Sequence, residues 1–236
     1  MYSNAFCKVY NEFGWNYFPE AFGEQLLVWI QRNHVEVKTS LDLACGTGIL
    51  CEVLHKTGIK ASGMDFSEGM IEIAKENNPD IEYEVADMIL YRPDRKFDLV
   101  TCTGDALNHI IDLNNVERIF QNIYTYLSDG GYFIFDLLNE KEVSEDDEPF
   151  DLDFSEEVKA QFRMTKTPEG MIQLRTKVFE NGEFQFEEVI TETVHDVDKV
   201  CEMLKRCGFQ IRSCAHQLLE DTPAQATTWF IIAQKI

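Results

Sequence analysis

Apolar residues between positions 39 and 136 fall into short continuous runs, and the segments between these runs have helical spacing. Runs of this length that alternate with helices are typical of strands buried in a parallel sheet. The clearest helical segment follows Asp112, an expected N-cap, and a second one begins at Ser67. The pattern predicts a doubly wound α/β fold. The expected parallel strands are residues 39–44, 59–64, 81–86, 97–102 and 132–136.

The alternation of predicted strands and helices ends after Asp136. Residues 140–157 hold ten acids and one Lys, which is too much charge for a buried segment. Three segments of alternating polar and apolar residues follow, at 158–166, 171–180 and 183–194, and Asn181-Gly182 is a strong hairpin signal. We therefore expect an antiparallel β meander inserted after the fifth strand. A helix at 198–207, with Gly208 as its C-cap, and strands at 210–218 and 227–233 complete a seven-stranded, mostly parallel sheet.

Aromatic residues are concentrated at the amino terminus, where eight fall within the first 22 positions. Two interpretations remain open. The segment is either a helix packed on the edge of the sheet, or a lid that folds some of its rings over a bound ligand. The eight residues are Tyr2, Phe6, Tyr10, Phe13, Trp15, Tyr17, Phe18 and Phe22.

The charge balance narrows the range of partners. With 42 Asp and Glu against 21 Lys and Arg, the net charge is -21 and the pI is about 4.5. Nucleic acids and anionic membranes attract basic surfaces, so we expect neither as a partner.

The cysteines and the lengths of the apolar runs indicate the cellular compartment of the protein. The seven cysteines are scattered and contain no CxxC pair, so we expect reduced thiols and no metal site. No signal segment opens the chain, and no apolar run is long enough to span a membrane. These features are typical of a soluble cytoplasmic protein, and a monomer and a homodimer are both compatible with them.

A candidate ligand crevice follows the first predicted strand, which runs into Gly46-Thr47-Gly48 and then a helical segment. Glycines let a ligand approach the backbone, and the helix offers free N–H groups. The next two strands end in Asp65, which suits ribose hydroxyls, and in Asp87. NAD and S-adenosylmethionine both use such a crevice. The dinucleotide fingerprint has a third glycine where this chain has Cys51, so the balance favours the sulfonium cofactor.

These motifs resemble those of the class I S-adenosylmethionine-dependent methyltransferases, over almost the whole chain. The three motifs correspond to residues 42–48 (DLACGTG), 63–70 (GMDFSEGM) and 86–88 (ADM). The resemblance implies that Asp65 binds the ribose hydroxyls, that Phe66 packs on adenine and that Asp87 holds the adenine amino group. The expected cofactor residues are Tyr10, Tyr17, Asp42, Ala44, Gly46, Gly48, Asp65, Phe66, Met70, Asp87, Met88 and Thr103.

Within that family, residues 102–110 resemble small-molecule enzymes such as glycine N-methyltransferase and the aminosugar N,N-dimethyltransferases. Those members also carry an antiparallel insertion and an aromatic amino-terminal segment. The very acidic connector departs from them, and the acceptor stays open. The expected organisation is an amino-terminal helical cap at 1–38, a cofactor-binding core at 39–139, an acidic connector and β insert at 140–195, and the last helix and two strands of the core at 196–236.

Methyl transfer from a sulfonium is an in-line displacement, so the enzyme mainly positions a nitrogen or oxygen nucleophile and excludes water. His109 is the candidate catalytic base, with a capping or cofactor-orienting role as the alternative. Asp105, Asn108 and Asp136 are candidate substrate residues. The acidic segments at 140–157 and 180–198 are a solvated face in the first interpretation, and in the second they lie near the cleft and attract a cationic small-molecule acceptor. An NAD(P)-dependent oxidoreductase and a non-catalytic S-adenosylmethionine-binding protein are the competing hypotheses.

Overall fold

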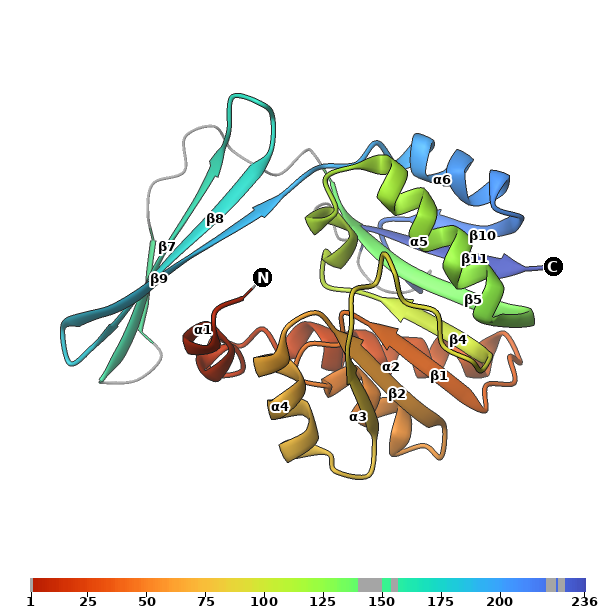
Figure 1. Ribbon diagram of the computed structural model, residues 1–236, viewed down its shortest axis with the longest axis horizontal. Helices are drawn as coiled ribbons and strands as arrows, with labels where there is room; N and C mark the ends of the chain where they lie inside the picture. Colours follow the sequence, from red (N-terminus) through yellow and green to blue (C-terminus); the bar gives the residue numbers. More distant parts are fainter. Residues whose placement is uncertain (1, 140–149, 154–156, 220–223, 225–227) are drawn as a thin grey trace.

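The computed structural model describes residues 2–139, 150–153, 157–219, 224 and 228–236. Its centre is one mostly parallel sheet (Figure 1). Seven strands follow one another in the order β10 (Phe209–Ala215), β11 (Thr228–Lys235), β5 (Leu127–Leu138), β4 (Phe97–Cys102), β1 (Thr39–Leu43), β2 (Lys60–Asp65) and β3 (Glu82–Val85). β11 is antiparallel to both of its neighbours, and the other adjacent pairs are parallel. The predicted fold class is confirmed.

Helices cover both faces of this sheet (Figure 1). One face is covered by α2 (Tyr17–Arg32), α3 (Ile49–His55) and α4 (Glu68–Asn77), and the other by α5 (Leu113–Tyr126) and α6 (Val197–Arg206). The predicted N-caps are confirmed, because Ser67 accepts from the Met70 N–H and Asp112 accepts from the Asn114 N–H, whereas the C-cap of α6 is Cys207 and the predicted Gly208 is the left-handed residue after it. In the part of the chain that the structure describes, no helix has the length and apolar character to cross a bilayer.

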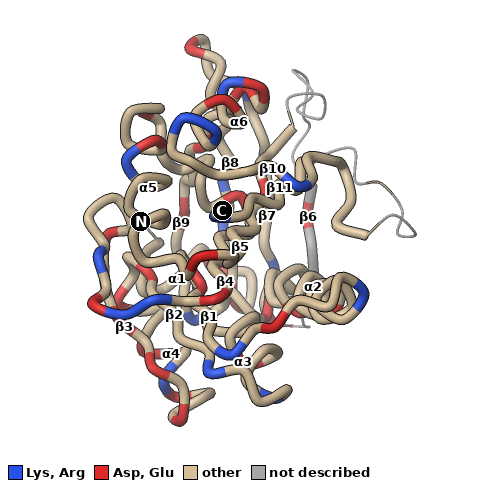
Figure 2. Tube along the Cα trace, turned by 90° about the vertical axis from the view of Figure 1, so that its right-hand side faces the viewer, with Lys and Arg blue, Asp and Glu red and all other residues tan. Residues whose placement is uncertain are grey.

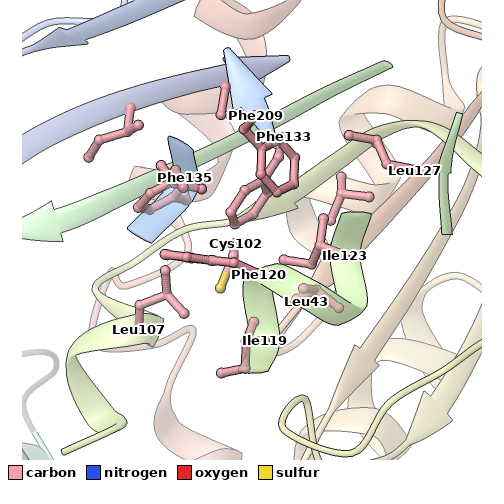
Figure 3. Close-up of a cluster of buried hydrophobic side chains, with 14 of the residues drawn as sticks. Leu43, Cys102, Leu107, Ile119, Phe120, Ile123, Leu127, Phe133, Phe135 and Phe209 are labelled. Atoms are coloured by element: carbon pink, nitrogen blue, oxygen red, sulfur yellow. The ribbon is translucent and has the colours of Figure 1, made fainter. Parts of the chain in front are cut away.

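The larger hydrophobic core lies between α5 and the middle of the sheet. Phe120 of α5 packs on Phe133 and Phe135 of β5, with ring centroids 5.8 and 5.7 Å apart, and all three are fully buried (Figure 3). The short 3-10 helix η1 (Ala106–His109) inserts Leu107 into the same cluster. The loop after β4 is therefore anchored in the core.

The fifth strand is longer than predicted. β5 begins at Leu127, five residues before the expected start at 132, so Gly130-Gly131 lies inside the strand. The pairing register between β4 and β5 shifts here, and Gly130 has a φ of 80°, a left-handed conformation that favours glycine. The glycines thus mark a bulge at the start of the strand.

The chain leaves the central sheet after β5 and forms a second, antiparallel sheet, here called the insert sheet. Its order is β6 (Phe150–Asp153), β7 (Val158–Lys166), β8 (Ile172–Glu180) and β9 (Glu183–Glu192). The predicted meander and its hairpin are confirmed, with left-handed backbone at both Asn181 and Gly182.

One strand of the insert sheet was not predicted. β6 falls within the acidic segment 140–157, where the charge indicated a connector; residues 140–149 and 154–156 of that segment lie outside the described residues. An edge strand pairs on one side only and tolerates charge, and β6 pairs only with β7. The side chain of Asp151 accepts a hydrogen bond from Gln161 at the exposed edge.

The amino-terminal aromatic residues join the two sheets. α1 (Asn4–Val9) lies between the insert sheet and the core (Figure 1). Phe6 and Phe13 are buried against Phe162 of β7, together with Trp15, whose ring lies 4.8 Å from that of Phe6. Neither interpretation of this segment was complete, because these rings pack mainly on the insert sheet. We call the group formed by Phe6, Tyr10, Phe13, Trp15 and Phe162 the aromatic cluster.

Truncation of this cluster should loosen the insert from the core. We expect Phe6→Ala, at a fully buried ring, to lower the free energy of unfolding by about 3–5 kcal/mol in urea denaturation. Phe184→Ala, at a ring 57% exposed on the insert sheet, is the control and should cost less than about 1 kcal/mol. Equal losses in the two variants would contradict this view of the cluster.

Candidate active site

The turn after β1 and the end of β2 form the centre of the crevice. Ala44 and Gly46 both have a left-handed backbone, with φ of 56° and 53°. The Gly46 N–H donates to Asp65 Oδ2 at 2.9 Å, and the Ser67 N–H donates to Asp65 Oδ1 at 2.8 Å. A Cβ added at Gly46 would meet no atom within 4 Å, so the backbone here borders open space. Two backbone donors thus hold Asp65 beside an open crevice.

Gly48 closes the same turn against β3. Its φ is 83°, and a Cβ at this position would collide with the hydroxyl of Tyr83, which donates to the Gly48 carbonyl at 3.4 Å. Cys51 is buried in α3 and its thiol donates to the Ser62 carbonyl of β2 at 3.5 Å. A side chain therefore fills the helix–strand contact that glycine provides in dinucleotide-binding turns.

The ends of β2 and β3 present apolar surface next to a carboxylate. Phe66 is 54% exposed and Leu90 is 58% exposed, unusual values for large apolar side chains. Asp87 Oδ1 accepts the Ile89 N–H at 2.8 Å, and no described residue binds Oδ2. Met88 lies half-buried against the core beside this turn. An exposed aromatic face next to a carboxylate oxygen fits an adenine ring and its amino group.

Three expected cofactor residues have surroundings that point elsewhere. Met70, in the first turn of α4, is fully buried. Its side chain therefore belongs to the core, and a direct cofactor contact is not supported. Asp42 is buried below the glycine turn, where it accepts from Thr101 Oγ1 at 2.7 Å and burial raises its pKa to about 7. Tyr17 is 71% exposed at the start of α2.

Two acidic side chains meet at the ends of β4 and β5. Asp136 is buried and accepts the N–H groups of Gly104 at 3.1 Å and Asp105 at 3.2 Å. Asp105 has a left-handed backbone, with a φ of 57°, and its Oδ1 is buried with no hydrogen-bond partner in the described structure. Burial raises the pKa of Asp105 to about 6, and burial and the charge of Asp105 raise the pKa of Asp136. Thr103, also an expected cofactor residue, is half-buried in the same loop.

Asn108 links three parts of the chain instead of facing the crevice. Its Nδ2 donates to the Thr193 carbonyl at 2.7 Å, and its Oδ1 accepts the Leu138 N–H at 3.1 Å. The Thr193 N–H in turn donates to the Asn108 carbonyl at 2.8 Å. Asn108 is fully buried, so the geometry does not support the expected substrate contact and assigns it a structural role.

His109 is partnered by an acid that the sequence analysis did not single out. The Nε2 of His109 lies 3.5 Å from Glu192 Oε1, at the end of β9. Burial lowers the pKa of His109, whereas burial and then the charge of Asp105 raise the pKa of Glu192 to about 7. The signal for Glu192 was the alternation along β9, where even-numbered residues such as Ile190 face inward. The alternation alone does not tell which face of β9 points inward, so Glu192 could not be singled out from the sequence.

Aromatic rings from the amino terminus reach the same place. The ring of Tyr2 meets that of His109 edge-on, with centroids 6.2 Å apart, and lies 5.9 Å from Tyr10. Burial raises the pKa of Tyr10 to about 12, with contributions from the charges of Asp65 and Asp105. Tyr10 is therefore close enough to both Asp65 and Asp105 for their charges to act on it, and its predicted contact with the cofactor stays a prediction.

Charged residues are distributed differently outside and inside. Both signs occur around α4 and α6 on the outside of the molecule (Figure 2). Among the ion pairs of described residues, none joins a Lys or Arg to Asp105, Asp136 or Glu192. In the same described ranges, no three His, Cys, Asp or Glu side chains gather as a metal site requires.

The strands and turns that border this crevice lie largely within the part of the chain that matches a known protein family. Residues 41–131 match the model of a methyltransferase domain. Over its whole length the chain is 28% identical to YqeM of Bacillus subtilis, which carries the name of a methyltransferase, and the alignment covers 98% of that protein. It is also 34% identical over 107 residues to the ubiquinone biosynthesis O-methyltransferase of Coxiella burnetii, an alignment that covers 43% of this chain and 44% of the relative.

Solved structures share the fold. An S-adenosylmethionine-dependent methyltransferase from Clostridium acetobutylicum superposes with a TM-score of 0.80 at 22% identity, and the match covers 90% of each chain. CalS10, an amino pentose methyltransferase from Micromonospora echinaspora with S-adenosylmethionine bound, gives 0.77 at 16% identity over 100% of this chain and 98% of that one.

The position of Asp65 allows a direct test of the cofactor side. We expect Asp65→Ala to weaken S-adenosylhomocysteine binding about 100-fold or more in calorimetry, because each hydrogen bond to a charged group contributes about 1.5–3 kcal/mol. Glu68→Gln, an exposed acid on the next turn of chain, is the matched control and should bind as the wild type does. Unchanged affinity in a folded Asp65→Ala protein would refute the role of Asp65.

The sheet order, the glycine turn with Asp65 and the match over residues 41–131 agree with one another. They favour a methyltransferase over the oxidoreductase considered from the sequence, and the residues along the crevice fit S-adenosylmethionine as the cofactor. Residues 41–131 form a methyltransferase domain, and the whole chain is similar in sequence and fold to S-adenosylmethionine-dependent methyltransferases.

Proposed function

We propose that the enzyme methylates an amine nitrogen of a small molecule. The observation that supports this acceptor class is the buried oxygen of Asp105, which has no partner among the described residues and lies beside Asp136. A carboxylate removed from water without a counter-charge is costly, and a protonated amine would supply both the charge and the hydrogen bonds.

The surroundings of Asp105 favour a cation over a neutral acceptor. Asp136 and Glu192 bring two further carboxyl groups to the same region, and burial raises the pKa of each. Neighbouring carboxyls resist ionisation together, and a bound ammonium group would relieve that repulsion. Buried carboxyls with raised pKa values cluster at functional sites, which supports the placement of the acceptor here.

The names of similar proteins support a small acceptor and leave one alternative. CalS10 is named as an amino pentose methyltransferase, which agrees with a nitrogen acceptor. The Coxiella burnetii relative is named as an O-methyltransferase of ubiquinone biosynthesis, and it is the more similar in sequence over the part aligned. Methylation of a phenol oxygen is therefore the second candidate function.

The roles that we assign to this chain's residues follow from an in-line displacement. S-adenosylmethionine, when bound, supplies a methyl group activated by its sulfonium. Asp65, Asp87 and Phe66 would hold it on the cofactor side. Asp105 and Asp136 would orient the acceptor, whose nucleophile has to lie about 3–3.5 Å from the methyl carbon. Tyr2 and Tyr10 would keep water out, and His109 would accept the proton that the acceptor loses.

An acceptor screen decides between nitrogen and oxygen. We expect methyl-labelled S-adenosylmethionine to label small amines and amino sugars, and not phenols or carboxylic acids. We expect Asp105→Asn to raise the KM for the amine about 10-fold or more, because it removes one charged partner. Asn also tolerates the left-handed backbone, so the loop should keep its shape. Asp80→Asn, at an exposed acid, is the control. Labelling of phenols alone would establish the second candidate instead.

The net charge of -21 leads to a salt dependence. We expect kcat/KM for a protonated amine to fall several-fold between about 0.01 M and 0.1 M salt, as the Debye length shrinks from about 30 Å to 10 Å. A neutral acceptor in the same assay is the control. A salt-independent rate with the amine would show that charge does not guide the acceptor.

A further inference from the structure

The insert sheet brings one acidic side chain to the proposed base. Glu192 is the last residue of β9, and its side chain is 19% exposed. Its Oε1 lies 3.5 Å from the Nε2 of His109, which belongs to η1 of the core. Catalytic hydrogen bonds are often this long before a substrate is bound. The two residues are 83 positions apart in the sequence, and the bonds between Asn108 and Thr193 fix the neighbouring backbone on both sides.

The groups around this pair determine how it holds a proton. Asp105 faces it from the loop after β4, and its charge acts on Glu192. Tyr2 covers it from the amino terminus, edge-on to the His109 ring. Along the insert sheet, Lys166 and Ile172 occupy the same row of paired residues as Glu192, with Lys166 two strands away. The ring of Tyr2 is held in turn by the neighbouring Ser3, whose hydroxyl donates to Glu188 at 2.7 Å.

A histidine alone is a poor proton acceptor in these surroundings. Removal from water penalises the imidazolium, and burial lowers the pKa of His109 accordingly. A carboxylate on the ring nitrogen stabilises the imidazolium and fixes the orientation of the ring. Glu192 is the acid in contact distance of His109 among the ion pairs of the described residues. The core therefore provides His109, and the insert provides the carboxyl group of Glu192 that can stabilise its imidazolium form.

We propose that Glu192 is a positioning residue for His109, and that the pair accepts the proton released by the acceptor ammonium. This inference rests on the proposed amine acceptor. The N–H bond of the ammonium breaks, its electrons stay on nitrogen, and His109 takes the proton while Glu192 balances the charge. The freed lone pair then forms the N–C bond as the C–S bond breaks with its electrons on sulfur. The proton on His109 later returns to solvent.

The titration of His109 in the protein without acceptor tests the pair directly. The chain has five histidines, and His109→Gln identifies the His109 signal in NMR spectra by its loss. We expect Glu192→Gln to lower the midpoint of the His109 titration by about one pH unit, because the pair titrates as a unit: when it holds one proton, the Glu192 carboxylate stabilises the imidazolium and Gln does not. Glu192→Asp keeps the charge and should restore most of the shift. Glu187→Gln, on the opposite face of β9 and paired with Arg175, is the matched control.

Kinetics test the same pair in turnover. We expect Glu192→Gln to lower kcat about 10-fold or more with unchanged affinity for S-adenosylhomocysteine, and to move the acidic limb of the pH–rate profile to lower pH. The double variant His109→Gln/Glu192→Gln should be no slower than His109→Gln alone, because residues that act as a unit are not additive.

The outcomes separate this inference from the proposed function. An unchanged His109 midpoint in folded Glu192→Gln would overturn the role of Glu192, whatever the acceptor. A wild-type enzyme that methylates no amine would overturn the proposed function, and the NMR titration would still decide whether the pair exists. Additive rate losses in the double variant would also count against the pair.

Discussion

The buried amide of Asn108 determines how the two sheets of this molecule meet. It binds Leu138, where the chain leaves the core, and Thr193, where the chain returns from the insert. The residues proposed to face the acceptor lie close to this junction in the chain: Asp105 precedes Asn108, His109 follows it, Asp136 lies two positions before Leu138, and Glu192 adjoins Thr193. An amide whose partners were lost here would leave buried donors and acceptors unpaired, so the junction admits few alternative arrangements.

The site combines an apolar environment with acidic chemistry. Burial is the first cause of the raised pKa of Asp105, Asp136 and Glu192. The net charge of the chain acts at long range and the buried carboxyls at short range, so both terms favour a cation. The cofactor side differs, because backbone N–H groups hold Asp65 and need no charged partner from the acceptor.

Local patterns were enough to predict the core and the residues that border the crevice at the ends of β2 and β3. Asp65 and Asp87 follow strands whose apolar runs are evident, and Ser67 and Asp112 cap helices as their neighbours suggest. The acceptor side could not be predicted in this way. Asn108 and Glu192 owe their roles to contacts with residues 85 and 83 positions away, and no local pattern reports such contacts. β6 was missed because charge indicates exposure, which an edge strand shares with a loop.

The contact between the amino terminus and the insert has a consequence for how the protein forms during synthesis. Ser3 binds Glu188, 185 positions later, and Phe6 packs on β7, so these contacts of the amino terminus form only after the insert has been translated, whereas the contact of Cys7 with Ser67 of the core does not need the insert. Strands β1 to β5 lie in the first 138 residues, and the turn that holds Asp65 belongs to them. Contacts of long sequence separation form late because their loop-closure entropy is large. In the nascent chain, the strands and the turn that hold Asp65 are therefore complete before the insert, which brings Glu192 to the proposed acceptor side, has been made.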